Sequence, residues 1–354
     1  MNPESGHATR CPVPVRSRAR LVPVCLLAVV ASGFAGDNRV STHVENGSPQ
    51  SRTFSLAQTA AGHDPVPANA VFVRGSNAFV AVGSRLVIVD ISDRTRPAVI
   101  GQTRALPDAI EDVAVAGTIA YVTSGDSGLW VIDVSNPSLP SVLGMYDSPG
   151  AASGVHVDGT HAYLADSWAG LQVVDVSDPT APTVIGQVRT AGRALAVDVA
   201  GNHAYVAADE GGLRIIDVSD RAAPVQVASY SAAGDVNDVA LVNNVAYLAA
   251  GGGGVEVVDV TQPNSPKHVG VYTQLYGKSI HVANGYAFLA TERTGLWIID
   301  VSGLKAPVTV GNFDTIQSAN DVYVDGGYAF VATGRSGLRV IDVSNPAAPV
   351  ALDQ

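Results

Sequence analysis

The chain has 354 residues, of which 47% are hydrophobic and 15% charged, and its formal net charge is −11. This acidic balance argues against a protein that binds nucleic acid, because neutralising phosphates requires clustered Lys and Arg. The charged fraction is well below the roughly 25% of ordinary globular proteins, and 36 Gly and 20 Pro are typical of short strands joined by tight turns.

Residues 1–35 have the features of a signal peptide. A basic segment containing Arg16, Arg18 and Arg20 precedes an apolar run at residues 21–30, which is too short to span a bilayer, and small residues follow. We therefore expect export to the periplasm, the cell surface or the medium, with no integral membrane span once the signal is cleaved. An uncleaved anchor is the alternative. Both cysteines of the chain lie in this segment, so the mature chain would contain none.

Residues 36–66 have the composition of a leader or linker. They are rich in Ser, Asn, Gly and Pro and lack a sustained periodic pattern. One strand-like stretch, residues 53–58, precedes the first repeated strand at the place where the last strand of a preceding repeat would lie. We expect this stretch to be a clasp strand that pairs at the outer edge of the last repeat.

Residues 67–354 contain seven copies of one unit of about 42 residues. The string Leu-x-Val-Ile-Asp-Val-Ser recurs at spacings of 43, 42, 42, 42, 41 and 42 residues. Each unit has four short apolar runs separated by turn residues, which in the second unit are residues 112–115, 120–123, 129–134 and 142–146. The aspartates of the seven strings are Asp90, Asp133, Asp175, Asp217, Asp259, Asp300 and Asp342.

The four runs of a unit, named strands A to D, predict the fold. Strand C is apolar on both pleat faces, with Leu129 and Val131 on one face and Ile132 and Val134 on the other. Such a strand is buried on both sides, as in a propeller blade that is sandwiched between two neighbours. Gly- or Asn-containing A–B turns and Pro-containing C–D turns connect the strands. We therefore predict an all-β fold, a seven-bladed β-propeller of four-stranded antiparallel blades.

The string Leu86-Val87-Ile88-Val89-Asp90 and its copies resemble the LVIVD-repeat family of exported bacterial and archaeal proteins. The resemblance covers about residues 69–354, and the fourth to sixth copies depart from the pattern at single positions. It implies a propeller and an exported location. It implies little about mechanism, because that family is largely without assigned biochemistry.

Function is expected on one rim of the propeller. The A–B and C–D turns are nearly constant among the seven copies, whereas the B–C and D–A connections vary, and these two variable sets emerge on the same face. Variation on one rim is typical of a scaffold with a grafted site, and also of relaxed selection on exposed loops. The candidate binding residues on this rim are Asp126, Asp166, Trp168, Asp209, Glu210, Tyr276, Glu292, Arg293 and Arg335.

Trp168 lies in a B–C loop, and an exposed loop tryptophan is a platform for a sugar ring or a peptide, although packing over the blade is the alternative. We therefore favour a monomeric, non-enzymatic scaffold that binds a protein or a carbohydrate. The alternative is a hydrolase or lyase that uses acidic residues of the same rim as acid and base. Such an enzyme needs titratable groups that converge near the channel mouth.

The sequence offers two possible arrangements for a metal ion, and neither predicts a cofactor. The acids of the rim are candidates for Ca²⁺, but the sequence contains no Asp-x-Asp-x-Asp-Gly loop, so solvated acids are favoured. His156, Asp198 and His281 share one position of strand A, which lines the channel, and they form a possible two-His-one-carboxylate set. Channel-facing polar side chains are the favoured interpretation. The repeated aspartates are expected to cap the turn after strand C.

Overall fold

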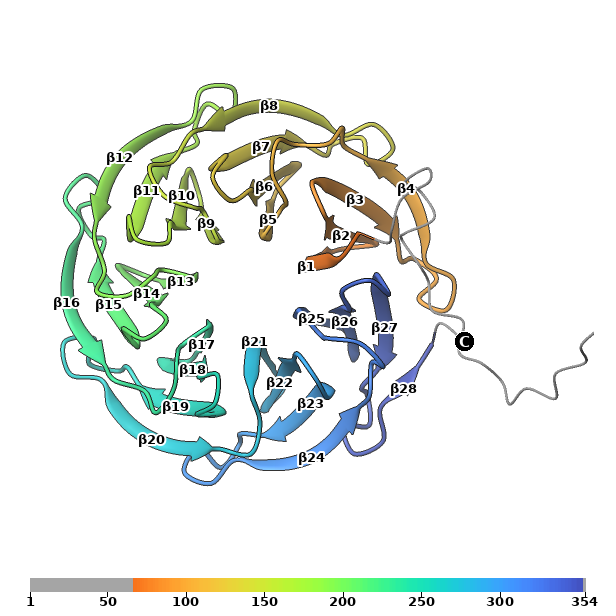
Figure 1. Ribbon diagram of the computed structural model, residues 1–354, viewed down its shortest axis with the longest axis vertical. Helices are drawn as coiled ribbons and strands as arrows, with labels where there is room; N and C mark the ends of the chain where they lie inside the picture. Colours follow the sequence, from red (N-terminus) through yellow and green to blue (C-terminus); the bar gives the residue numbers. More distant parts are fainter. Residues whose placement is uncertain (1–65, 353–354) are drawn as a thin grey trace, which may run out of the picture. The chain divides into compact units, whose positions relative to one another are not determined.

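The computed structural model describes residues 66–352, which form seven four-stranded antiparallel sheets arranged in a ring around a central channel (Figure 1). In every sheet the strands pair in sequence order, with strand A innermost and strand D outermost. Within residues 66–352 the chain forms strands and turns and no helix. The predicted seven-bladed β-propeller is therefore confirmed.

Each blade consists of four consecutive strands that correspond to A, B, C and D. Their bounds are, for blade 1, β1 (Ala68–Arg74), β2 (Asn77–Val82), β3 (Arg85–Asp90) and β4 (Ala98–Gln102); for blade 2, β5 (Asp112–Ala116), β6 (Ile119–Thr123), β7 (Leu129–Asp133) and β8 (Ser141–Tyr146); for blade 3, β9 (Gly154–Asp158), β10 (His161–Ala165), β11 (Leu171–Asp175) and β12 (Thr183–Val188); for blade 4, β13 (Ala196–Ala200), β14 (His203–Ala207), β15 (Leu213–Asp217) and β16 (Val225–Tyr230); for blade 5, β17 (Asp238–Val242), β18 (Val245–Ala249), β19 (Val255–Asp259) and β20 (Lys267–Tyr272); for blade 6, β21 (Gly277–Ala283), β22 (Tyr286–Thr291), β23 (Gly295–Asp300) and β24 (Val308–Phe313); and for blade 7, β25 (Asp321–Asp325), β26 (Tyr328–Ala332), β27 (Leu338–Asp342) and β28 (Val350–Ala351).

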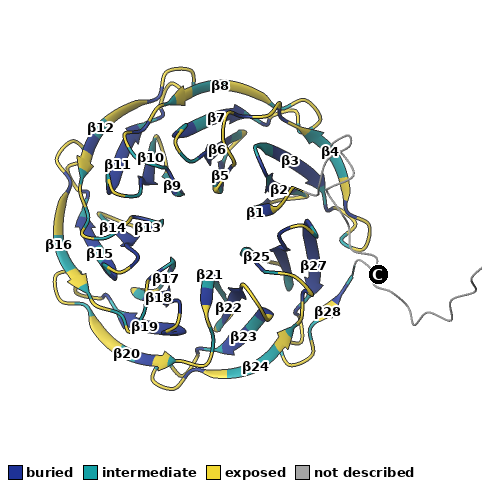
Figure 2. Cartoon of the chain, viewed as in Figure 1, coloured by how far each residue is buried: buried dark blue, intermediate teal, exposed yellow. Residues whose placement is uncertain are grey.

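The hydrophobic core lies between neighbouring blades. Leu129, Val131 and Ile132 of β7 are fully buried, on both faces of the strand. The apolar clusters cross blade boundaries, so that Ile88 of β3 and Val122 of β6 belong to one cluster. The D strands lie at the periphery and are the most exposed strands (Figure 2). Burial against two neighbours explains why strand C lacks apolar-polar alternation.

Blades 7 and 1 close the ring where the start of β1 meets the rim connections of blade 7. The Ala68 amide donates to the Gly334 carbonyl at 2.8 Å, and the Asn320 side-chain amide donates to the Ala68 carbonyl at 2.8 Å. Blade 7 contains its own D strand, β28, which pairs with β27. Closure among the described residues therefore uses side-by-side packing of complete blades, without exchange of a strand.

The repeated aspartates cap the C–D turns, as predicted. The Asp133 carboxylate accepts the Ser135 amide at 2.8 Å, and Asp90 accepts the Ser92 amide at 2.8 Å. These hydrogen bonds to the charged form lower the pKa of both carboxyl groups. The other five copies make the same contact with the residue two positions on. A capping role explains all seven aspartates without catalysis.

The predicted signal peptide at residues 1–35 and the clasp strand at residues 53–58 lie outside the described residues, as does nearly all of the 36–66 linker. Residues 66–352 contain no helix of the length and hydrophobicity that crossing a membrane requires.

Candidate binding surface

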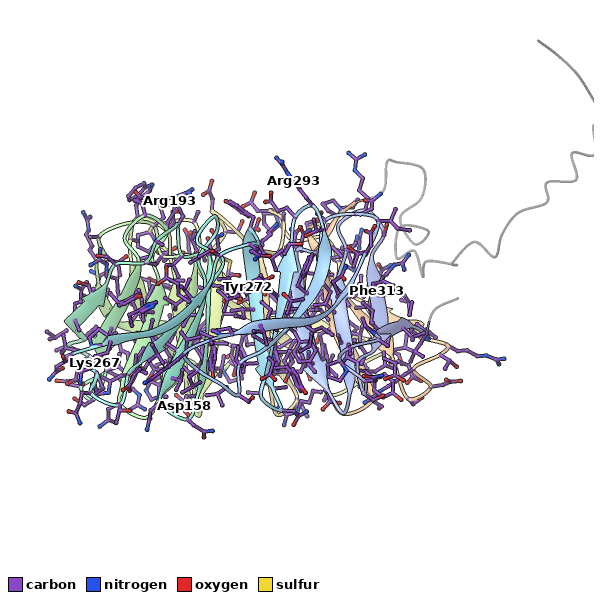
Figure 3. The ribbon with its side chains drawn as sticks, turned by 90° about the horizontal axis from the view of Figure 1, so that it is seen from below. Asp158, Arg193, Lys267, Tyr272, Arg293 and Phe313 are labelled. Carbon is purple, nitrogen blue, oxygen red and sulfur yellow. The ribbon has the colours of Figure 1, made fainter. Side chains whose placement is uncertain are left out.

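The B–C loops and the D–A connections lie together on one face, which we call the variable rim. In side view, Arg193 of a D–A connection and Arg293 of a B–C loop lie at one face of the disc, whereas Asp158 at an A–B turn lies at the opposite face (Figure 3). The strand order of each blade requires this separation, because strands A and C run towards one face and strands B and D towards the other.

The B–C loops repeat one backbone conformation and vary at its tip. In five blades the second loop residue has a left-handed φ between 46° and 51°, and in two of these it is a non-glycine residue, Ser167 or Asp209. Non-glycine residues rarely adopt this conformation, so the surrounding structure imposes it. The third loop residue is the exposed tip. It is Asp126 in blade 2, Trp168 in blade 3, Glu210 in blade 4, Gly252 in blade 5, Arg293 in blade 6 and Arg335 in blade 7.

Trp168 stands in a groove of about 880 Å³ on the variable rim. Its side chain is 61% exposed, so it does not pack over the blade. Asp126 of blade 2, the D–A connection at residues 148–151 and the end of blade 3 at residues 187–189 complete the walls. The structure thus brings together two of the predicted residues, Trp168 and Asp126, in a concave site, which we call the Trp168 groove.

Asp166 supports this groove from within. Its side chain is fully buried, and its carboxylate accepts the Ser148 hydroxyl at 2.8 Å and the Gly150 amide at 3.0 Å. Burial raises the pKa of Asp166, and the two hydrogen bonds oppose that rise. The sequence predicted a ligand-contacting acid here. The structure instead shows a residue that fixes the wall at 148–151.

Asp209 is also buried, with 7% of its surface exposed. Arg193 of the adjacent D–A connection donates to one Asp209 oxygen from Nε at 2.8 Å and from Nη2 at 2.5 Å. These bonds raise the pKa of Arg193. The pair therefore joins a B–C loop to its D–A connection, and the accessible acid of this loop is Glu210.

Tyr276 and Glu292 lie away from the Trp168 groove, at the mouth of the channel. They line a cavity of about 350 Å³ together with Glu111 and Lys278. Tyr276 is 52% exposed, and Lys278 donates to the Asn320 side-chain oxygen at 2.9 Å. The predicted residues are thus divided between the groove, the channel mouth and the exposed arginine tips of blades 6 and 7.

Three carboxylates inside the channel belong to the acids that the sequence assigns to the D–A connections, but not to the candidate binding residues. Asp112, Asp238 and Asp321 begin the A strands of blades 2, 5 and 7 and line both channel cavities. Burial raises the pKa of Asp112 to about 6 and that of Asp238 to about 8, and it also raises that of Asp321. The sequence signal for these three carboxylates is that Asp recurs at one position of the repeat, the start of strand A.

Each of these carboxylates joins two blades. Asp238 accepts the Val239 amide at 2.8 Å and the Ile280 amide of blade 6 at 2.9 Å. Asp112 and Asp321 make the corresponding bonds to blades 3 and 1. Because both oxygens of each carboxylate bind backbone amides of the innermost strands, the arrangement is that of an inter-blade tie.

The two histidines of the possible metal-binding set, His156 and His281, line the channel. His156 Nδ1 lies 3.1 Å from Asp198 Oδ1, and Asp198 additionally accepts the Leu241 amide at 2.8 Å. His281 packs against Tyr323 with ring centroids 4.7 Å apart, and burial lowers the pKa of His281 to about 4. Within residues 66–352 no three His, Cys, Asp or Glu side chains converge in an arrangement that would hold a metal ion. The contacts of His156 and His281 are those of channel-lining side chains.

Seven complete blades with a constant framework and a varied rim define a β-propeller repeat scaffold. The chain belongs to the LVIVD-repeat family. The profile of the LVIVD repeat matches seven segments, residues 67–104, 109–148, 149–190, 191–232, 233–274, 276–315 and 317–352. None of the curated proteins matches this chain.

Solved structures of other propellers share the fold at low identity. A functionally unknown protein from Desulfotomaculum acetoxidans has a TM-score of 0.63 at 15% identity, covering 74% of this chain and 90% of that one. The Cps50 (Swd1) β-propeller domain of Myceliophteria thermophila has 0.66 at 12%, covering 78% and 96%. The computationally designed Ika8 protein has 0.62 at 10%, covering 85% and 89%. At such identities the likeness shows the fold alone.

Proposed function

We propose that this protein is an exported, non-enzymatic scaffold of the cell surface or periplasm that binds a protein or carbohydrate partner through the variable rim. The proposal rests on the side chains at the tips of the B–C loops. Side chains of opposite charge, a tryptophan and a glycine occupy equivalent positions on closely similar backbones. A constant framework that presents different side chains at one face is how binding surfaces are built on repeat folds.

The rim has the anchors that such a surface needs. Among the described residues of this face, Trp168, Tyr276 and Ile316 are large hydrophobic side chains that are more than half exposed, at 61%, 52% and 74%. Ile316 has a φ of 66°, which is rare for a β-branched residue, and its amide is held by the Asp314 carboxylate at 2.8 Å. Tryptophan and tyrosine side chains such as these are enriched among binding hot spots.

The charges of the tips are also segregated around the ring. Acidic tips occur in blades 2 and 4, at Asp126 and Glu210, whereas Arg293 and Arg335 form the tips of the adjacent blades 6 and 7. A partner with the complementary arrangement would bind in one orientation, because the opposite orientation juxtaposes like charges.

Export rests on the N-terminal sequence. We expect cleavage after Gly33 or after Ala35, so that the secreted or periplasmic protein begins at residue 34 or 36, which N-terminal sequencing of the protein from fractionated cells measures. Recovery of the intact N-terminus from the cytoplasmic fraction would contradict export without affecting the rim.

A hydrolase or lyase remains the second candidate, favoured by the raised pKa of Asp112 and Asp238 beside the channel cavity. Their oxygens are already bound by backbone amides, which favours the scaffold. An activity on a panel of glycans and esters that Asp238→Asn abolishes, with the melting temperature retained, would establish the enzyme instead.

The direct test is capture of partners by the full-length protein, using a glycan array and a pull-down from the envelope fraction. The rim variant combines Trp168→Ala, Arg293→Ala and Arg335→Ala. The matched control is Leu139→Ala, a side chain that is 75% exposed in a C–D turn on the opposite face. We expect the rim variant to lose the captured partner and the control to retain it. Loss in the control alone would place the site on the opposite face.

A further inference from the structure

The Trp168 side chain is presented by a loop that is fixed on both sides. On one side Asp166 bonds to Ser148 and Gly150 of the blade 2 connection. On the other side the Ser167 and Ala194 backbones exchange two hydrogen bonds of 3.0 and 2.9 Å. The indole therefore projects from a base anchored to two D–A connections. Little backbone entropy remains to be lost when a ligand binds there.

The polar side chains of the groove are available to a ligand. Asp126, Gln187 and Arg189 line the Trp168 groove and are exposed. None of the three side chains forms a hydrogen bond or ion pair with another residue of the described range, and the Trp168 indole N–H is likewise without a partner there. By contrast, the buried rim acids Asp166 and Asp209 are engaged in internal contacts. The groove thus combines one exposed aromatic face with three free planar polar groups.

We propose that the Trp168 groove binds a neutral oligosaccharide, with one pyranose ring stacked on the Trp168 indole and its hydroxyl groups bonded by Asp126, Gln187 and Arg189. This inference rests on the proposed function and names the ligand class for its principal site.

A pyranose ring matches this set of groups because it has an apolar C–H face and an edge of adjacent hydroxyl groups. The C–H face stacks on an aromatic ring. A carboxylate, a carboxamide and a guanidinium each bond in one plane, so each bridges neighbouring hydroxyls. The groove, at about 880 Å³, lies in the upper part of the roughly 300–1,000 Å³ range of small-ligand sites. It therefore accommodates more than one sugar ring.

The charges favour a neutral glycan over an acidic one. Asp126 and Arg189 contribute one charge of each sign to the groove. The chain as a whole carries a formal net charge of −11, which repels a polyanionic glycan at a distance. A sugar without charged groups avoids leaving either side chain beside a like charge.

The test is titration of the full-length protein with neutral oligosaccharides of β-1,4-glucose, α-1,4-glucose, β-1,4-mannose and β-1,4-N-acetylglucosamine, followed by calorimetry and by tryptophan fluorescence. We expect one series to bind. Trp168→Ala should weaken that binding by about tenfold or more, whereas Trp168→Phe should retain most of it. In Trp168→Phe the ligand-induced fluorescence change should disappear although calorimetric binding persists, because Trp130 and Trp297 lie elsewhere. Asp126→Asn should weaken binding severalfold.

The matched control is Leu139→Ala, which alters a side chain that is 75% exposed on the opposite face and should leave the affinity for the sugar unchanged. If no neutral glycan binds but a captured protein is lost in Trp168→Ala, the sugar assignment is wrong and the rim scaffold stands. Sugar binding that Trp168→Ala leaves intact also overturns the assignment. If neither the Trp168 nor the combined rim variant affects any captured partner, the proposed function itself fails.

Discussion

At the scale of single residues, the buried Asp166 carboxylate fixes one wall of the groove. It holds the 148–151 wall through Ser148 and Gly150. Asp166→Ala leaves two partially buried donors without an acceptor. We expect it to lower the free energy of unfolding by roughly 1–3 kcal/mol and to loosen the groove. Thermal or urea unfolding measures this.

Asp126→Ala is the matched control for Asp166→Ala, because Asp126 is an exposed acid in the equivalent loop of blade 2. Its effect on stability should stay within about 0.5 kcal/mol. Equal stability losses in the two variants would show that Asp166 is an ordinary surface acid.

Asp238 predicts a dependence of stability on pH. Its ordinary pKa of 3.8 rises to about 8 in the folded protein, chiefly through burial. Such a group contributes full stability below the unfolded pKa, and this contribution is lost as the pH rises through the folded value. The melting temperature of the wild type relative to Asp238→Asn should therefore fall between pH 4 and 8 and level off above pH 8. The free energy of unfolding of the wild type relative to Asp238→Asn should fall by at least about 1.4 kcal/mol over this pH range, which is the equivalent of one pKa unit.

Asp133→Asn is the control for this pH series. The hydrogen bonds of its capping turn lower the pKa of Asp133, so its contribution is lost only as the pH falls below the ordinary range of a carboxyl group. The difference between wild type and Asp133→Asn should be flat from pH 4 to 8. A flat curve for Asp238→Asn as well would mean that the Asp238 carboxyl ionises normally in the channel.

The sequence predicts whether a rim residue is exposed or buried only where its exposure does not depend on contacts with the D–A connections. For Trp168, which lies in a short loop between two small residues, the sequence leaves open an exposed platform or packing over the blade, and the structure shows it exposed. Asp166 and Asp209 lie in the same kind of loop, yet both are buried. Their burial depends on Ser148 and Arg193 in D–A connections 16 to 18 residues away. A repeat pattern contains no information on such contacts, because these connections are its variable part.

At the scale of elements, close packing of the D strands against the following blade explains why most of them carry a glycine. Gly101 of β4 lies against the C–D turn of blade 2, and a Cβ atom there would be 2.0 Å from the Pro137 carbonyl oxygen. A Cβ atom at Gly144, Gly186, Gly270 or Gly311 would likewise lie 2.1 to 2.6 Å from a backbone oxygen of the following blade. Gly101→Ala must push two blades apart, so we expect a loss of about 1–3 kcal/mol in unfolding free energy.

Blade 4 supplies the matched control, because it carries Ala228 at the register that Gly144 occupies in blade 2. Ala228→Gly removes one methyl group from a site that already accommodates it, and should cost about 1 kcal/mol or less. A Gly101→Ala protein with wild-type stability in chemical unfolding would show that the blade contacts at this strand are loose.

The elements themselves were largely predictable. The second-unit runs at residues 112–115, 120–123, 129–134 and 142–146 agree with β5 to β8 to within one residue at most ends. Seven copies average out the ambiguity of any single apolar run, and two-sided burial gives strand C an apolar string. The inter-blade ties of Asp112, Asp238 and Asp321 were not predicted, because they depend on which blades become neighbours and on the empty hydrogen-bonding edge of strand A.

At the scale of the whole molecule, the ring closes where blade 7 meets blade 1. The outermost strand of blade 7, β28, has only two residues, whereas the other D strands have five or six. An additional strand from residues 53–58 would cover this short outer edge. Deleting residues 50–60 should then lower the melting temperature by at least about 2 °C. Deleting residues 38–48 of the same linker is the control and should have no effect, and equal melting curves for both deletions would exclude the clasp.

We propose that this propeller binds its partner at the variable rim and, within it, at the Trp168 groove. Amide hydrogen exchange of the full-length protein, measured with and without the captured partner, tests it most directly because it requires no choice of residue beforehand. We predict slower exchange at residues 124–128, 148–151 and 166–170, with unchanged exchange in the A–B and C–D turns. Protection confined to the A–B and C–D turns, with the rim loops unaffected, would contradict the account.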